Sequence, residues 1–259
     1  MLELISEYAS ILLKAEDTHV AIEPITKIFP SITVDEAYQI QLEQIAAKVK
    51  KGRKIVGKKI GLTSKAMQNM LNVKQPDYGH LLDDMMIIDG ETMSLDGLIQ
   101  PKLEFEIAFV LKKDLKGPVV TFQDVIEATD YVVPAIEVID SRIENWNIKF
   151  EDTVADNGSS ARAVIGGKPT PISDLDLSLL GMAVYRNGQL FDTAAGAAVM
   201  ANPIHAVAWL ANSLAKYDIS LYKGEIVLSG ALTAAVPVTS GDTFTAKFDR
   251  IGEVSLTIK

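Results

Sequence analysis

The stretch IQPKLEFEIAFVL, residues 99–111, carries two glutamates inside an otherwise apolar strand pattern. Residues two apart in an extended chain face the same side. One face is therefore apolar (Leu103, Phe105, Ile107, Phe109 and Leu111), and the other face holds Lys102, Glu104, Glu106, Ala108 and Val110. The two carboxylates are neighbours, with Cα atoms roughly 6–7 Å apart. They repel each other unless water, a proton or a cation lies between them.

A third acid in an apolar strand pattern is Glu137, in YVVPAIEVIDSR (residues 131–142). Three carboxylates on two strands could form an all-oxygen site for a hard divalent cation such as Mg²⁺ or Mn²⁺. The cation would then act as a Lewis acid on a ligand chelated at its open positions. The alternative is a half-solvated antiparallel strand with an ordinary polar face. Both interpretations stay open, because the sequence does not show that the two strands are adjacent.

A pair of lysines lies in a second strand pattern, KIVGKKIGL (residues 54–62). Lys58 and Lys59 face opposite sides of such a strand, so one can be solvated while the other points inward. A partly desolvated lysine has a lowered pKa and can transfer protons near neutral pH. Lys59 is therefore a candidate catalytic residue, with a surface lysine pair as the alternative.

Two polar stretches offer further candidates. QPDYG (residues 75–79) places Asp77 in a turn, where capping is the default role. DTVADNGSSAR (residues 152–162) offers Asn157, Ser159, Ser160 and Arg162 as donors to a substrate carboxylate, although such a stretch is also common in loops.

Composition excludes several classes of function. The 259 residues, 48% hydrophobic and 23% charged, are typical of a globular protein, and a net charge of −9 argues against a nucleic-acid surface. The absence of cysteine excludes disulfides, thiolate nucleophiles and Cys-based zinc sites. No G-x-S-x-G, P-loop or G-x-G-x-x-G motif occurs, and no two histidines have ligand spacing. The acidic N-terminal pattern and the lack of a long apolar run predict a cytoplasmic protein without a membrane span.

The element pattern predicts a mixed α+β fold. TVDEAYQIQLEQIAAKVKKG (residues 33–52) predicts a helix with Thr33 as its cap and a buried stripe of Val34, Tyr38, Leu42, Ile45 and Val49. Strand patterns follow at residues 54–62, 85–89, 102–111, 130–140, 161–167, 225–230, 243–248 and 253–258, with a hairpin at 184–191 and helices at 64–72, 122–130 and 202–218. Residues 73–84 are expected to form a loop. We therefore expect a helical and αβ portion over residues 1–75 and a β-rich catalytic region over residues 76–259, together one compact unit.

Motifs over nearly the whole chain resemble a known family. They are VGKKIGLTSKAMQNML, QPDYG, IQPKLEFEIAFVL, VVPAIEVIDSRIENW, DTVADNGSS, GAAV and VAWLAN, in this order. They resemble the 2-hydroxypenta-2,4-dienoate (2-keto-4-pentenoate) hydratase and 4-oxalocrotonate decarboxylase family of the fumarylacetoacetate hydrolase superfamily. The resemblance implies a β-barrel-like core with flanking helices and a homo-oligomer that often reaches a decamer.

The resemblance also implies roles for individual residues. Mg²⁺ or Mn²⁺ would be held by Glu104, Glu106 and Glu137. Lys59, Asp77 and Ser159 match the family's active-site lysine, acid and serine.

The motifs are less specific for the branch within the family. Asp77, SKAMQNML and KFEDTVADN favour the hydratases, whereas NGSSAR with Arg162 and LTAAVPV resemble the decarboxylases. We expect a hydratase that converts 2-hydroxypenta-2,4-dienoate to 4-hydroxy-2-oxopentanoate in meta-cleavage catabolism of aromatic compounds. The alternatives are decarboxylation of 2-oxo-3-hexenedioate, or a non-catalytic subunit in a complex with the partner pathway enzyme.

Overall fold

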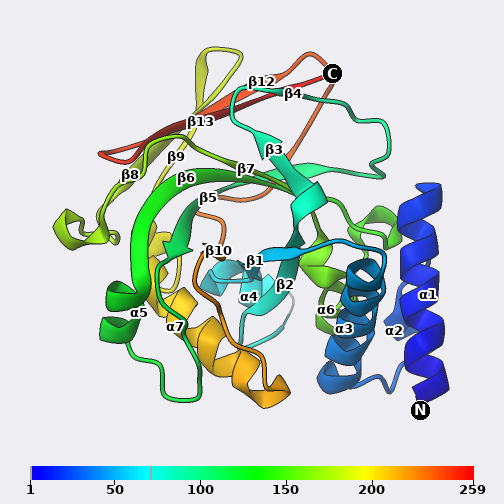
Figure 1. The fold of residues 1–259 in the computed structure, drawn as a ribbon. Coiled ribbons are helices and arrows are strands. Elements are labelled where there is room, and N and C mark those ends of the chain that lie inside the picture. Colours follow the sequence, from blue (N-terminus) through cyan, green and yellow to red (C-terminus); the bar gives the residue numbers. More distant parts are fainter. Residues whose placement is uncertain (1, 71) are drawn as a thin grey trace.

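Two β-sheets flanked by helices form the structure, a computed structural model that describes residues 2–70 and 72–259 (Figure 1). The helices are α1 (Leu2–Thr18), α2 (Ile25–Ile28), α3 (Val34–Lys50), α4 (Lys65–Met70), α5 (Phe122–Ala128), α6 (Phe150–Ala155) and α7 (Pro203–Leu214). The strands are β1 (Ile55–Gly61), β2 (Asp77–Leu82), β3 (Met86–Ile88), β4 (Thr92–Met93), β5 (Lys102–Leu111), β6 (Thr129–Ile139), β7 (Ser160–Ile165), β8 (Gly181–Arg186), β9 (Gln189–Ala195), β10 (Ile226–Leu228), β11 (Val236–Pro237), β12 (Thr243–Phe248) and β13 (Gly252–Ile258).

The larger sheet has the strand order β2-β1-β10-β5-β6-β7-β3, with β11 also paired to β5. The smaller sheet has the order β4-β13-β12-β8-β9. Helices α1, α2, α3 and α6 lie together at one side of the larger sheet, and α5 and α7 lie at the other (Figure 1). The expected α+β class is confirmed, but the expected barrel is not closed, because β2 and β3 remain as separate edges of the larger sheet.

The expected helix in residues 33–52 forms as α3. The Thr33 side chain accepts a hydrogen bond from the Glu36 backbone N–H, and the Glu36 carboxylate accepts from the Thr33 N–H at 2.7 Å, which makes a capping box. In the predicted stripe Tyr38 and Ile45 are buried, but Val49, in the last turn, is 42% exposed. Val34 and Leu42 are only half-buried, so the predicted stripe is right for Tyr38 and Ile45 and wrong for Val49.

Residues 73–84, expected as a loop, contain strand β2, in which all six residues are buried. β2 pairs antiparallel with β1, and Asp77 is opposite Gly61 at the end of this pairing. The Pro76 and Gly79 signals that favoured a turn are outweighed by these long-range strand contacts. Asp77 is therefore a buried strand residue and not a turn cap.

Local turn and cap signals elsewhere are confirmed. Asn187 and Gly188 both have positive φ, as a tight turn between β8 and β9 requires. Asn202 accepts a hydrogen bond from the Ile204 N–H, and Pro203 is the first residue of α7.

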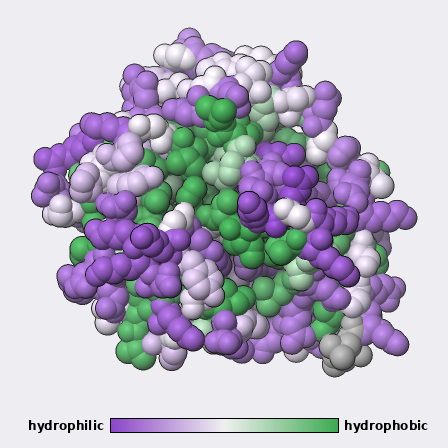
Figure 2. Space-filling view, viewed as in Figure 1, coloured by the Kyte–Doolittle hydropathy of each residue, from purple (hydrophilic) through white to green (hydrophobic). Residues whose placement is uncertain are grey.

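One hydrophobic core runs through both portions of the chain, from Ile5 in α1 to Ile258 in β13. This shared core supports the proposal that the two portions form one compact unit. In the view of Figure 2 apolar surface gathers toward the middle of the face, surrounded by hydrophilic side chains. Over the described residues no helix combines the length and the apolar character that crossing a membrane requires.

Candidate active site

Three glutamates converge on one side of the larger sheet. β5 and β6 are antiparallel neighbours, and their register places Glu104 opposite Glu137. Glu106 follows Glu104 on the same face, and one oxygen from each of the three carboxylates lies within 4.8 Å of the others. Glu106 and Glu137 are fully buried, so the interpretation as an ordinary solvated face is wrong for both.

The buried carboxylates have few partners of their own. Glu106 Oε2 accepts a hydrogen bond of 2.6 Å from the Gly230 N–H. Glu106 Oε1 and both oxygens of Glu137 accept no hydrogen bond from the described part of the chain. Burial raises the pKa of Glu137 to about 7, and burial together with the neighbouring Glu137 raises that of Glu106 well above its usual range. A divalent cation would remove this cost, so the site fits a hard metal ion bound by oxygen.

Lys59 is buried beside these carboxylates. Its Nζ lies 3.4 Å from Glu137 Oε2 and donates a 3.0 Å hydrogen bond to the Gly158 carbonyl. Burial alone would lower the pKa of Lys59, but four surrounding carboxylates, of which Glu137 is the strongest, raise it overall. The lowered pKa expected for Lys59 from desolvation is therefore wrong in direction.

Lys58, on the opposite face of β1, is also buried, which the sequence did not indicate. Its Nζ forms an ion pair of 2.8 Å with Glu225, which lies next to β10. The expectation that one lysine of the pair is solvated is wrong, because a partner 167 residues away compensates the buried charge.

Asp77 faces the same cavity from the end of β2. Its Oδ2 accepts a hydrogen bond of 3.4 Å from the Thr153 hydroxyl, and Oδ1 has no hydrogen-bond partner among the residues that the structure describes. Burial raises the pKa of Asp77, and Lys59 opposes that shift. A β-carbon at Gly61 would lie 2.1 Å from Asp77 Oδ1, so glycine leaves the room that this carboxylate occupies.

The turn after α6 brings polar groups to the same place. Asn157, Gly158 and Ser159 all have positive φ, a strained run for two residues that are not glycine. Ser159 lines the cavity, and its hydroxyl donates to Asp156 at 3.2 Å. The Asn157 side chain instead accepts from the His80 N–H and donates to the His80 carbonyl, so it holds β2 in place.

Ser160 and Arg162 were the remaining candidates. The Ser160 hydroxyl is buried without a hydrogen-bond partner in the described chain, but Ser160 is not among the residues that line the cavity. Arg162 is half-buried and lines a separate cavity of about 240 Å³, together with Glu16 and Arg142. The structure therefore does not bring Arg162 to the glutamate cluster.

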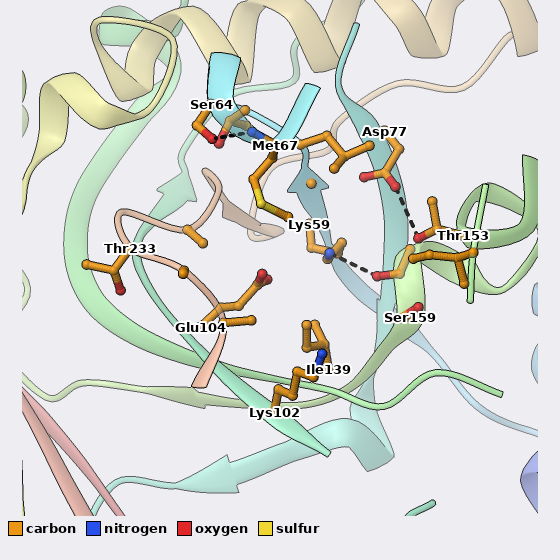
Figure 3. A pocket seen from close by; sticks show the side chains of 18 of the residues that line it. Lys59, Ser64, Met67, Asp77, Lys102, Glu104, Ile139, Thr153, Ser159 and Thr233 are labelled. Atoms are coloured by element: carbon orange, nitrogen blue, oxygen red, sulfur yellow. Dashed lines mark hydrogen bonds between the residues drawn. The ribbon is translucent and has the colours of Figure 1, made fainter. Parts of the chain in front are cut away.

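The cavity in front of Glu104 has a volume of about 420 Å³. Its polar wall includes Lys59, Asp77, Lys102 and Ser159, and Figure 3 shows these side chains directed around a common space. Apolar side chains complete it, among them Leu62, Met67, Ile148 and Leu232. A cavity of this size admits a small organic acid and has both charged and apolar walls for it.

Contributors to the site outside the sequence predictions include Lys102, Thr153, Trp146 and the Gly230 N–H. Thr153 and Trp146 lay within the motifs of the resemblance, but only the folded chain shows that they reach the cavity. Gly230 has a φ of +112°, a backbone conformation that glycine adopts easily. The glycine in the sequence could have indicated this conformation but not the hydrogen bond to Glu106.

Comparisons with known proteins agree with the motifs. Residues 49–259 match the family model described as the fumarylacetoacetate (FAA) hydrolase C-terminal domain. The chain is 47% identical to a 2-hydroxyhexa-2,4-dienoate hydratase of Comamonas testosteroni (90% of this chain and 89% of that one). It is 46% identical to a 2-keto-4-pentenoate hydratase of Paraburkholderia xenovorans strain LB400 (96% and 92%).

A solved structure is also similar over the entire chain. The 4-oxalocrotonate decarboxylase from Pseudomonas putida G7, complexed with magnesium and adipate, superposes with a TM-score of 0.97 at 40% identity, covering 100% of this chain and 98% of that one. The chain therefore belongs to the 2-keto-4-pentenoate hydratase and 4-oxalocrotonate decarboxylase family of the fumarylacetoacetate hydrolase superfamily.

Proposed function

We propose that this protein is a lyase that uses Mg²⁺ or Mn²⁺ to hydrate 2-hydroxypenta-2,4-dienoate to 4-hydroxy-2-oxopentanoate in meta-cleavage catabolism. The observation that carries the proposal is the buried Asp77 carboxylate, which faces the same cavity as Lys59 and Glu104. A base is needed to add water, and a simple decarboxylation needs none. The hydratase relatives at 46–47% identity support the same choice.

Glu104, Glu106 and Glu137 are proposed to hold the metal ion, because their oxygens converge within 4.8 Å and two of the side chains are fully buried. A cation held there would supply Lewis-acid stabilisation of the negative charge that develops on the 2-oxygen of the substrate. The Gly230 N–H holds Glu106 in place through its hydrogen bond.

Lys59 is proposed to transfer the protons of the first step. The dienol becomes a conjugated ketone when C5 gains a proton and the 2-hydroxyl loses one. As a buried cation, Lys59 can give its proton to C5 and recover the proton of the hydroxyl. Its hydrogen bond to the Gly158 carbonyl directs the ammonium into the cavity.

Asp77 is proposed to activate water in the second step. The hydroxyl of water adds to C4, its proton passes to the Asp77 carboxylate, and the same proton is returned to C3. Burial raises the pKa of Asp77, which makes its carboxylate a stronger base. Thr153 orients the carboxylate, and Ser159 is proposed to orient the substrate.

Turnover tests the proposal directly. Purified protein with Mg²⁺ should convert 2-hydroxypenta-2,4-dienoate to 4-hydroxy-2-oxopentanoate, and Asp77→Asn should abolish formation of this product. Decarboxylation of 2-oxo-3-hexenedioate is the second candidate, favoured by the similarity to the decarboxylase structure. Release of carbon dioxide from that diacid, unaffected by Asp77→Asn, would establish the second candidate instead.

We further propose that the protein acts in the cytoplasm as a homo-oligomer, a decamer being the state that the family resemblance implies. A complex with the partner pathway enzyme is also proposed, in which this chain would be an active subunit. Light scattering of the purified protein, alone and mixed with the partner enzyme, measures both assemblies.

A further inference from the structure

Lys102 places a second cation at the cavity. It is the first residue of β5, two residues before Glu104, so both side chains lie on the same side of the sheet. Lys102 lines the cavity together with Glu104 and Trp146. Its ammonium forms no ion pair or hydrogen bond within residues 2–70 and 72–259. It lies over an aromatic ring, with Nζ 4.2 Å from the centre of the Trp146 ring.

Trp146 is held in this position by its backbone and its indole N–H. Asn145 and Trp146 have φ angles of 57° and 53°, the left-handed region that such residues rarely adopt. The indole N–H donates a 3.0 Å hydrogen bond to the Gln100 carbonyl, two residues before Lys102. Backbone strain of this kind clusters at active sites and ligand-binding positions, where the surrounding structure holds a side chain in place. Here it fixes the ring against the ammonium.

An aromatic ring holds an ammonium without neutralising it. A carboxylate in the place of Trp146 would pair with Lys102 and cancel its charge. The ring therefore orients the ammonium and leaves its positive charge available to an anion in the cavity. This arrangement indicates recognition of a carboxylate, since the substrate class of the proposed function carries one.

The arrangement of the residues around the cavity indicates the direction in which the substrate lies. In the view of Figure 3, Lys102 lies on one side of Glu104, and Lys59 and Asp77 lie on the other. The proposed hydration needs C4 of the substrate near Asp77 while its C2 oxygen lies near the glutamates. C1 then points away from Asp77, toward Lys102. We propose that the Lys102 ammonium, held over the Trp146 ring, binds the C1 carboxylate and so sets the direction in which the substrate lies.

This inference rests on the proposed function for the direction of the substrate, but a binding measurement tests it without turnover. The probes are 2-oxopentanoate and its methyl ester, which keeps the 2-oxygen and loses the charge. Calorimetry is done with Mg²⁺ on the wild type, Lys102→Met and Lys102→Arg. Lys112→Met is the matched control, because Lys112 is an exposed lysine just beyond the other end of the same strand.

We expect Lys102→Met to weaken binding of 2-oxopentanoate by about 10- to 100-fold, the range for losing a charged hydrogen-bond partner. Lys102→Arg, which keeps the charge and stacks on aromatic rings, should lose much less. Binding of the methyl ester should not differ between the wild type and Lys102→Met, and Lys112→Met should bind both probes like the wild type.

Two results would overturn the inference. Lys102→Met could bind 2-oxopentanoate as tightly as the wild type, or it could lose the same factor for the ester, which would mean that Lys102 acts through packing. Lys102→Gln repeats the test if the Met variant does not fold. A wild type that binds the acid through Lys102 but does not hydrate the dienoate would refute the proposed function and leave this inference intact.

Discussion

Glu104 of β5 and Glu137 of β6 lie directly opposite each other in an antiparallel ladder, with Glu106 next along the same face. Like charges in opposite positions destabilise a sheet, and burial adds to the cost. In this protein the repulsion is offset in part by Lys59, whose Nζ lies 3.4 Å from Glu137, and by Lys102 beside Glu104. A divalent cation bound by all three carboxylates, as proposed, would favour their ionised forms and remove this repulsion.

Replacement of any one of these glutamates by glutamine should nearly abolish Mg²⁺ binding and activity. Removal of a residue that only supports a metal ligand lowers metal affinity or activity by roughly 10- to 100-fold. Removal of a ligand itself should lower both by more than this. Glutamine keeps the shape and removes a charge, so the fold should persist, and the metal-free variant should melt at the same temperature as the wild type or higher. Calorimetry with Mg²⁺ and thermal melting measure the two effects.

Glu144→Gln is the control for this set, because Glu144 is half-exposed and lies outside the glutamate cluster. It should bind Mg²⁺ like the wild type. Wild-type metal affinity in Glu104→Gln and Glu106→Gln would refute the proposed metal site.

The metal-free protein should become less stable as the pH rises from about 4.5 to about 7. The pKa of Glu137 is raised to about 7 in the folded protein, from an ordinary value of 4.5, and that of Glu106 is raised as well. Between these values the folded state holds protons that the unfolded state has released, so stability falls with increasing pH. Melting temperatures of the metal-free protein across this window should therefore decrease.

Added Mg²⁺ should remove this decrease, because it favours the ionised carboxylates and releases their protons. Magnesium affinity should accordingly increase with pH over the same range. A metal-free melting temperature that rises steadily from pH 5 to pH 7 would contradict the assignment of raised pKa values to these glutamates.

Gly61→Ala should impair catalysis and spare metal binding. The new β-carbon would meet Asp77 Oδ1 at 2.1 Å and would lie 3.4 Å from Lys59 Nζ, so the carboxylate must move. We expect kcat to fall by about 100-fold, the lower part of the range for a misplaced general base. Gly181→Ala is the matched control, since a β-carbon at this strand position meets no atom within 4 Å. Equal kcat values for the two variants would refute the proposed role of Asp77.

The Lys58–Glu225 pair should be important for stability and not for metal binding. Glu225→Gln leaves the Lys58 ammonium buried without its 2.8 Å partner, which should lower the free energy of unfolding by about 3–5 kcal/mol. The double variant Lys58→Met/Glu225→Leu should recover most of this loss. Denaturant unfolding measures the stability, and a single variant as stable as the wild type would show that the pair is not needed.

Local sequence patterns predicted the parts of the fold that depend on interactions between residues close in the sequence. The period of two in residues 102–111 predicted both faces of β5, Thr33 predicted the start of α3, and Asn187-Gly188 predicted the hairpin. In each case the residues that cause the structure are adjacent or a few positions apart. The resemblance to the family supplied the three glutamates as one group, which the pattern of each strand alone left open.

Contacts between distant parts of the chain could not be predicted in this way. Asp77 is buried because β2 pairs with β1, and Lys58 is buried because Glu225 lies beside it. The pKa of Lys59 is raised because carboxylates from several strands surround it, although burial alone predicts the opposite direction. Arg162 was expected to donate to a substrate carboxylate, but the register of β7 places it at another cavity.

The most direct test of the proposed function is identification of the product by proton nuclear magnetic resonance. The Mg²⁺-loaded protein is given 2-hydroxypenta-2,4-dienoate and 2-oxo-3-hexenedioate in separate reactions, with Asp77→Asn in parallel. The account predicts 4-hydroxy-2-oxopentanoate from the dienoate, no carbon dioxide from the diacid, and neither product from Asp77→Asn. Carbon dioxide from the diacid together with an unchanged dienoate would contradict it.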